Sequence, residues 1–202
     1  MSSTKVPETL AVFDFDGTIT TKDSMLACCR FVAGSSAYVT GMILLAPMLL
    51  AMKAGLVSRQ RTKEAFLSRF LKGKSREELQ SMAEAFTEEI LVHLIRPQAL
   101  SRIQQHKDQG HRLLIVSASL DIWLAPWAAS QEIPLLSSQG EFIDGIFSGK
   151  LTGENCRGVE KVKRITEYLG ADLPDHTIAY GDSSGDTELL QWADKAYFKP
   201  FR

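Results

Sequence analysis

The hydrophobic positions of this chain fall into short apolar runs separated by longer amphipathic stretches. The runs lack alternation between apolar and polar residues, which is typical of strands buried on both faces of a parallel sheet. Strands of this kind that alternate with helices indicate an α/β fold with right-handed crossovers. The strands are predicted at residues 10–15, 113–116, 177–180 and 196–198.

Helical patterns fill most of the remaining sequence. Proline or glycine stands at several of their ends, where these residues favour the start or the end of a helix. In the C-terminal half, helices are predicted at residues 97–109, 120–131, 159–169 and 186–192.

Two segments depart from this strand–helix rhythm. Residues 21–96 contain no convincing strand, which predicts an all-helical cap inserted after the first strand, while residues 1–20 and 97–202 form the core. Residues 141–151 alternate apolar with small or polar residues around two glycines, which predicts a small β-hairpin. Helices within the cap are predicted near residues 24–33, 39–54, 59–71 and 76–94.

Composition favours a soluble globular protein, because 45% of the 202 residues are hydrophobic and 23% are charged. The formal net charge of -1 provides no basic field, so we expect no nucleic-acid partner. Three cysteines at positions 28, 29 and 156 lack the spacing of a disulfide framework or a zinc site. Residues 1–8 lack the apolar core of a signal peptide, and we therefore expect a cytoplasmic location.

An uncharged apolar run at residues 41–52 complicates this picture. It is shorter than the roughly 20 residues that span a bilayer, and Pro47 is expected to interrupt it. One interpretation is a buried helix pair or an apolar wall of the cap. The other is a membrane-facing or lipid-facing surface, which would place the protein at the membrane periphery.

Carboxylates end two of the predicted strands. Asp14 and Asp16 close the first, and Asp182 and Asp186 follow the third. Open α/β folds bind ligands where the carboxyl ends of parallel strands meet. Carboxylates at that edge suit a hard cation such as Mg²⁺ or a nucleophilic attack on phosphorus. The competing interpretations are ordinary turns at both places.

A phosphoryl group at this edge would need hydrogen-bond donors and a fixed cation. Ser117 ends the second strand, where its hydroxyl and the backbone N–H groups that follow, at Ala118 and beyond, suit a phosphate oxygen. Residues 156–164 contain four basic candidates for the cation, and their spacing alone does not choose among them.

Together these residues resemble the four motifs of the haloacid dehalogenase superfamily, most of whose members are phosphatases. Residues 14–18 match its DxDxT motif, Ser117 its second motif, Lys161 its third and residues 181–186 its GDxxxD motif. The resemblance covers essentially the whole chain and implies a three-layer, Rossmann-like core with a central parallel sheet. The helical insertion is similar to the small cap of the phosphoserine-phosphatase-like branch, subfamily IB, and resembles the bacterial subgroup that contains phosphatidylglycerophosphatase C.

The resemblance implies a magnesium-dependent phosphomonoester hydrolase that acts through an aspartyl-phosphate intermediate. Asp14 would be the nucleophile and Asp16 the general acid and base. Ser117 and Lys161 would hold the phosphoryl group, with Arg157 as the alternative to Lys161. The implied metal ligands are the side chains of Asp14 and Asp182 and the backbone carbonyl of Asp16. Supporting roles are implied for Thr18, Asp23, Ala118 and Asp186.

The expected substrate is a small or lipid-linked phosphomonoester. Phosphoserine is an alternative, because Asp23 aligns with the cap Glu that reads its amine. Against phosphoserine, the fourth motif lacks an Asn and no cap arginine clearly matches, although Arg59 and Arg61 are nearby. A catalytically silent binding protein of the same fold is an alternative of another class. A dehalogenase is disfavoured because such enzymes lack the acid found at Asp16.

Overall fold

A six-stranded sheet in the order β4-β3-β2-β1-β5-β6 forms the centre of the molecule. The computed structural model describes residues 7–202. Residues 1–6, which belong to the polar N-terminal stretch and to the predicted core segment 1–20, lie outside the described residues. All neighbouring strands are parallel except β3 and β4. The strands are β1 (Thr9–Phe13), β2 (Arg112–Leu120), β3 (Leu135–Ile143), β4 (Ile146–Thr152), β5 (His176–Gly181) and β6 (Lys195–Phe198).

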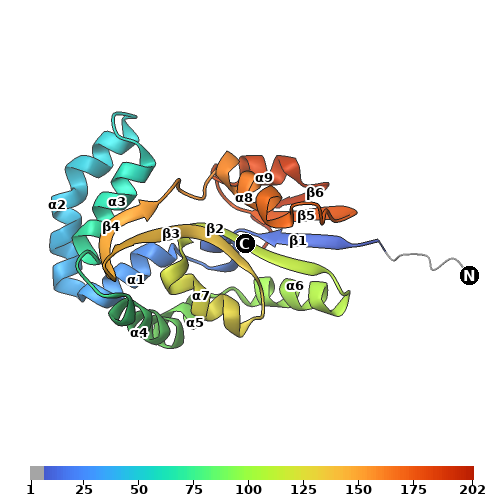
Figure 1. Cartoon of the computed structure of the whole chain (residues 1–202), viewed down its shortest axis with the longest axis horizontal. Helices are drawn as coiled ribbons and strands as arrows, with labels where there is room; N and C mark the ends of the chain where they lie inside the picture. Colours follow the sequence, from blue (N-terminus) through green and yellow to red (C-terminus); the bar gives the residue numbers. More distant parts are fainter. Residues whose placement is uncertain (1–6) are drawn as a thin grey trace, which may run out of the picture.

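Helices cover both faces of this sheet (Figure 1). Ala11 and Phe13 of β1 face the core shared with α6 and α7, whereas Leu10 and Val12 face the core shared with α8 and α9. Because both faces of β1 are buried, its sequence is apolar without alternation. The predicted α/β class with a central, mostly parallel sheet is confirmed. These helices are α6 (Pro97–Asp108), α7 (Asp121–Ser130), α8 (Val159–Leu169) and α9 (Thr187–Trp192).

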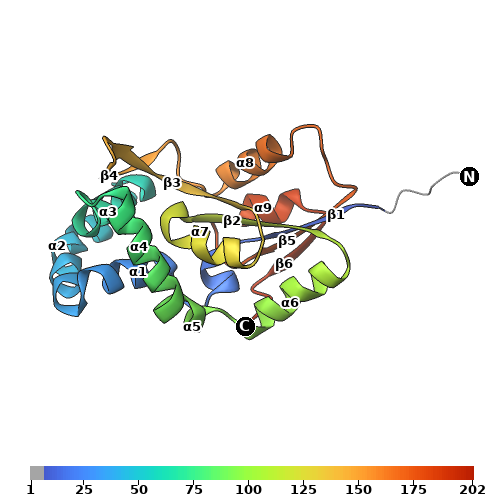
Figure 2. The ribbon, with the colours of Figure 1, turned by 60° about the horizontal axis from the view of Figure 1, so that its bottom comes forward.

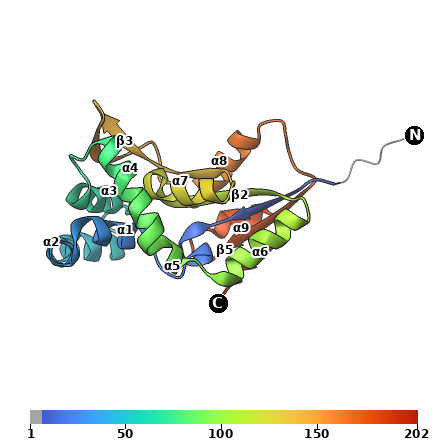
Figure 3. The same ribbon diagram turned by 90° about the horizontal axis from the view of Figure 1, so that it is seen from below.

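The segment between β1 and α6 forms a helical unit at one end of the sheet (Figure 2). An isolated antiparallel bridge between Thr20 and Ile95 joins the points where the chain leaves and re-enters the core. Figure 3 shows α4 beside α7, so this unit also packs on the core. Its elements are α1 (Ser24–Ala33), α2 (Ser35–Lys53), α3 (Arg59–Phe70), α4 (Arg76–Phe86), η2 (Thr87–Leu91) and α5 (Val92–Leu94).

Helix α2 corrects two expectations about the apolar run. The helix continues through Pro47, which was expected to interrupt it. The interpretation as a buried helix pair is also wrong: Gly41 is the one buried residue of α2, while Ile43 and Leu50 are 68% and 67% exposed. By length and composition alone, α2 could cross a membrane.

The predicted β-hairpin is confirmed by the antiparallel pairing of β3 with β4 around Asp144 and Gly145. The sequence did not predict the first half of β3, which pairs in parallel with β2. That part of the strand has only two apolar residues before two serines, so it lacks the apolar run that marks the other parallel strands. The hairpin reaches the helical unit, where the Ser68 hydroxyl donates to the Gly149 carbonyl at 3.2 Å.

Candidate active site

The carboxyl ends of β1, β2 and β5 meet beside the helical unit and open into a cavity of about 730 Å³. Asp14 follows β1, Asp182 follows β5, and the turn after Ser117 lies within β2. This is the edge where parallel α/β sheets place their ligands. The structure therefore brings together the residues that the sequence singled out at three separate strand ends.

The chain turns sharply after Asp14. The π-helical segment η1 (Phe15–Ile19) contains two residues with non-helical backbone angles, and Gly17 has a φ of 81°. A Cβ atom at Gly17 would collide with the Asp182 carboxylate. Glycine therefore permits both the left-handed turn and the close approach of η1 to the strand that carries Asp182.

Asp14 lies at the base of the cavity in a network of buried charges. The Lys161 ammonium contacts Asp14 Oδ1 at 2.5 Å and Asp186 Oδ1 at 2.6 Å, and it donates to the Val116 carbonyl at 3.1 Å. The Thr18 hydroxyl donates to Asp14 Oδ2 at 2.9 Å. Burial raises the pKa of Asp14 to about 7 despite the neighbouring ammonium. Burial also opposes the charge of Lys161, but the two carboxylates outweigh it and raise its pKa.

Arg157, the alternative to Lys161, is placed differently. It lines the cavity, and its guanidinium donates to the Ser184 hydroxyl at 2.8 Å. Lys161 is the basic residue of the 156–164 segment that contacts Asp14 within the described chain. The geometry thus brings Lys161, rather than Arg157, to the expected nucleophile.

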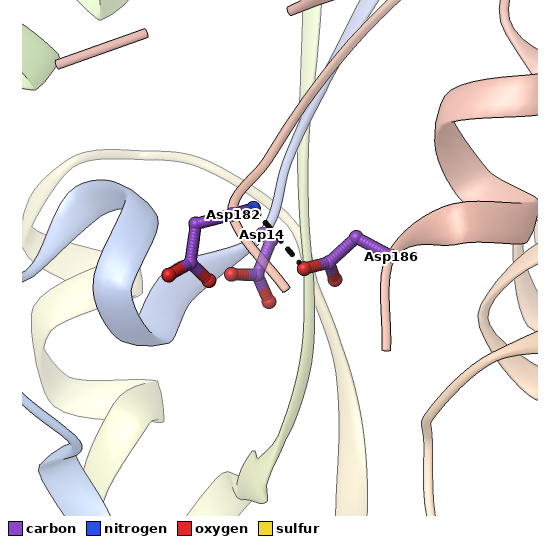
Figure 4. A group of neighbouring side chains, drawn as sticks. All are labelled: Asp14, Asp182 and Asp186. Carbon is purple, nitrogen blue, oxygen red and sulfur yellow. Dashed lines mark hydrogen bonds between the residues drawn. The ribbon is translucent and has the colours of Figure 1, made fainter. Parts of the chain in front are cut away.

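Three carboxylates converge beside the cavity. Asp14, Asp182 and Asp186 each offer an oxygen within 4.8 Å of the others (Figure 4). Asp186 is fixed by the N–H groups of Asp182 and Ser183, at 3.2 and 2.9 Å from its Oδ2. Burial, followed by repulsion from Asp186, raises the pKa of Asp182.

This donor set fits a magnesium ion. The three groups supply hard oxygen ligands, and the one buried ammonium does not balance their charge, so a divalent cation would relieve their repulsion. The exposed Arg202 contacts Asp182 and offsets part of that charge. Sequence reasoning named the side chains of Asp14 and Asp182, and the structure adds Asp186 to the group.

The Asp16 side chain points away from this cluster. Its Oδ1 accepts the Ser24 N–H at 2.6 Å and its Oδ2 accepts the Ser119 hydroxyl at 2.5 Å. Burial and the charge of Asp23 raise the pKa of Asp16 to about 6, while the bonds from Ser119 and Ser24 act in the opposite direction. A carboxyl group with this pKa can carry and release a proton near neutral pH. The backbone carbonyl of Asp16 thus stays the predicted metal ligand.

Ser117 is buried in β2, at the register shift that precedes Leu120. Its Oγ accepts the Ser119 N–H at 3.0 Å, which leaves the hydroxyl proton available to another acceptor. Ala118, which follows it, lines the cavity, whereas Ser117 does not. The arrangement can therefore present the backbone of Ala118 to an anion, with the Ser117 hydroxyl one residue from the cavity wall.

Sequence reasoning missed Lys63 of α3. Its ammonium donates to the Ala118 carbonyl and to Asn155 Oδ1, the latter at 2.8 Å. Burial lowers the pKa of Lys63 to about 8, although Asp16 and Asp23 oppose the shift. The sequence did contain a sign of its burial, because Lys63 lies on the same face of the helix as the buried Phe66 and Leu67.

Other side chains of the helical unit complete the cavity. Asp23 lines it and caps α1 by accepting the Leu26 N–H at 3.0 Å. Arg59 also lines it, whereas Arg61 does not. The apolar part of the wall consists of Met25, Leu26, Met42, Leu49, Met52 and Phe66.

Comparisons with known proteins agree with this geometry. The family of haloacid dehalogenase-like hydrolases matches residues 11–191. Protein CicA of Caulobacter vibrioides is 38% identical over 96% of this chain and 86% of its own. A protein of unknown function from Bordetella pertussis Tohama I superposes with a TM-score of 0.84, at 24% identity over 95% of this chain and 89% of that one. A substrate-bound phosphoserine phosphatase superposes with a TM-score of 0.70, at 16% identity over 96% and 87% of the two chains.

Proposed function

The chain belongs to the haloacid dehalogenase-like hydrolase family, and we propose that it is a phosphatase that hydrolyses phosphomonoesters through a phosphorylated Asp14 and with the help of Mg²⁺. The observation that carries this proposal is the position of Asp14. Its carboxylate lies at the base of the cavity, held by Lys161 and Thr18 and flanked by further carboxylates.

In the first step, a carboxylate oxygen of Asp14 attacks phosphorus, and the bond between phosphorus and the substrate oxygen breaks. Asp16 gives its proton to that oxygen, which leaves as an alcohol. In the second step, water attacks the phosphorus of the aspartyl phosphate. Asp16 takes a proton from the water, and Asp14 is released with inorganic phosphate.

The remaining residues hold the reacting group. We assign to Ser117 and Lys161 the binding of the phosphoryl oxygens, while Thr18 and Asp186 orient Asp14 and Lys161. Mg²⁺, when bound, supplies positive charge that offsets the repulsion between a carboxylate and a phosphate. The side chains of Asp14 and Asp182 and the Asp16 carbonyl would hold it, with Asp186 within reach.

The substrate that this cavity fits is a small or lipid-linked phosphomonoester with an apolar portion. Apolar side chains line the same cavity as Asp14, so an uncharged group could pack on Met42 and Met52 while its phosphate reaches Asp14. Residues 21–96 act as a cap over residues 1–20 and 97–202 and exclude water from the reaction. We assign the protein to the cytoplasm, at the membrane periphery. The exposed apolar side chains of α2 support the membrane contact.

Phosphoserine is the second candidate. Asp23 lies where it could meet an amine, and the cavity contains cap cations, Lys63 and Arg59, that could meet a carboxylate. A panel of phosphoserine, other small phosphomonoesters and phosphatidylglycerophosphate separates the two candidates. Turnover of phosphoserine alone would select the second, and absence of turnover throughout would favour the catalytically silent alternative.

The chemistry is tested with Asp14→Asn. We expect this variant to stay folded but to lose Mg²⁺-dependent phosphatase activity by at least about 10³-fold, because an amide is a poor nucleophile. Intact-mass analysis of acid-quenched protein should detect a phosphorylated species in the wild type and none in the variant. Near-wild-type turnover by Asp14→Asn, or full activity of the wild type in EDTA, would contradict the proposal.

A further inference from the structure

Asp16 is held on both of its carboxylate oxygens, and by two different parts of the molecule. Its Oδ1 accepts the N–H of Ser24, the first residue of α1, at 2.6 Å. Its Oδ2 accepts the hydroxyl of Ser119, near the end of β2, at 2.5 Å. The carboxyl group is thus clamped between the helical unit and the core.

The clamp continues into a chain of three buried side chains. The Ser24 hydroxyl donates to the Ser119 hydroxyl at 3.2 Å, and the Trp123 indole N–H of α7 donates to the Ser24 hydroxyl at 3.1 Å. Ser24 and Trp123 are fully buried and Ser119 is 4% exposed. Solvent therefore offers these groups few alternative partners.

The hydrogen bonds of this chain run in one direction, from Trp123 toward Asp16. The indole N–H can only donate, and the Ser24 oxygen accepts it. The Ser24 hydroxyl donates to Ser119, and the Ser119 hydroxyl donates to Asp16. Hydrogen bonds aligned in one direction polarise and strengthen one another in a buried site.

Both partners of the Asp16 carboxyl group donate to it, one to each oxygen. They hold the plane of the carboxyl group and leave the lone pairs that face neither partner for a proton. Asp16 lines the cavity that holds Asp14. The clamp therefore leaves Asp16 free to exchange a proton on the side that faces the cavity.

We infer that Ser119, Ser24 and Trp123 are positioning residues that aim the acid/base proton of Asp16 at the leaving oxygen of the substrate. The inference rests on the proposed function, because it assigns Asp16 the role of proton donor. It predicts that damage to the clamp matters most when the leaving oxygen needs a proton. An alkoxide is strongly basic and needs one, whereas p-nitrophenolate is a stable leaving group and hardly does.

The experiment compares kcat/KM for an alkyl phosphate, glycerol phosphate, with kcat/KM for p-nitrophenyl phosphate. This ratio reports the first step alone, whereas Asp16 acts in the same way on both esters in the second step. A positioned general acid is worth about 10² to 10⁴-fold. For Ser119→Ala we expect kcat/KM to fall at least about 30-fold on the alkyl ester and less than about 3-fold on the aryl ester. Trp123→Phe keeps a buried ring but removes the donor, and it should show a smaller loss with the same selectivity. Ser119→Thr restores the hydroxyl and should recover alkyl turnover.

Two comparison variants keep the outcomes separate. Ser137→Ala removes a hydroxyl that is also buried, in β3, but does not contact Asp16, and it should leave the alkyl-to-aryl ratio unchanged. Asp16→Asn tests the role of Asp16 itself. Suppose that Asp16→Asn loses activity selectively on the alkyl ester, while Ser119→Ala and Trp123→Phe lose equally on both esters. That result would overturn the positioning inference but leave the proposed function intact. Wild-type-like turnover by Asp16→Asn would overturn the proposed function with it.

Discussion

At the scale of single residues, the buried charges of the site depend on Lys161. Its ammonium is shared by Asp14 and Asp186, and all three groups are buried. Removing one member of such a group leaves an uncompensated buried charge, which is costly. Arg157 makes no such contact and donates to a serine at the cavity wall.

We therefore expect Lys161→Ala to reduce kcat by at least about 10²-fold and to lower the melting temperature, because it unpairs two carboxylates and removes a charge from the phosphoryl site. The matched variant Arg157→Ala should cost less than about 10-fold. Steady-state kinetics at saturating Mg²⁺ and thermal unfolding measure both effects. A larger loss in Arg157→Ala would transfer the phosphate-holding role to Arg157.

The sequence could locate the acidic residues because they lie within a few positions of a strand end. Asp14 and Asp182 follow apolar runs, and the geometry of a parallel sheet brings such ends together. Lys63 could not be found in this way. It meets Ala118 across 55 positions, so this contact exists only after the helical unit packs on the core. The bond between Ser119 and Asp16 joins two adjacent strand ends, but the direction of the Ser119 side chain is not readable from the sequence.

At the scale of elements, Lys63 ties α3 to the end of β2. Its ammonium reaches the Ala118 carbonyl beside Ser117, so the contact joins the helical unit to the turn expected to hold phosphate. Burial lowers the pKa of Lys63 from 10.5 to about 8. In the unfolded chain the side chain is exposed and keeps its ordinary pKa.

The sign of the resulting pH effect follows from proton counts. Between about pH 8 and 10.5 the unfolded chain binds more protons at Lys63 than the folded one, so stability rises with pH in this window. Across this pH window, the free energy of unfolding of the wild type should rise by up to about 3 kcal/mol more than that of Lys63→Met. Chemical denaturation at several pH values measures the difference. Lys72→Met, at an exposed lysine, should show no such relative change, and parallel slopes for the wild type and Lys63→Met would contradict the prediction.

Most elements could be predicted because their patterns are local. The apolar runs of β1, β2 and β5 and the capped helices match the structure closely. The failures arose where tertiary context decides. The start of β3 is a strand because β2 offers it a parallel partner, and α2 stays helical through Pro47 despite the expected break.

At the scale of the whole molecule, charge is distributed unevenly. Residues 24–74 carry eight Lys and Arg residues and one Glu, whereas the rest of the chain carries 15 Lys and Arg and 23 Asp and Glu. The basic segment includes α2, where Val39, Ile43, Leu44 and Leu50 are exposed. A near-neutral net charge thus conceals a basic, apolar end that suits an anionic lipid surface.

We expect the protein to co-sediment with vesicles that contain phosphatidylglycerol and much less with pure phosphatidylcholine vesicles, since basic residues near the surface favour anionic lipid. Added salt should weaken this binding, because it screens exposed charges. Replacing Ile43 and Leu50 by Glu should reduce binding by at least about 10-fold, since both side chains would lose apolar contact with the bilayer.

Leu173→Glu is the matched control. Leu173 is also a surface leucine, 63% exposed, but it lies in the loop between α8 and β5, away from α2. It should bind vesicles like the wild type. Equal binding by the Ile43/Leu50 variant and this control would mean that α2 does not contact the bilayer. If the α2 variant loses vesicle binding and turnover of phosphatidylglycerophosphate in vesicles but keeps turnover of a soluble phosphomonoester, then α2 serves delivery of the substrate. The chemistry at Asp14 is then independent of the membrane.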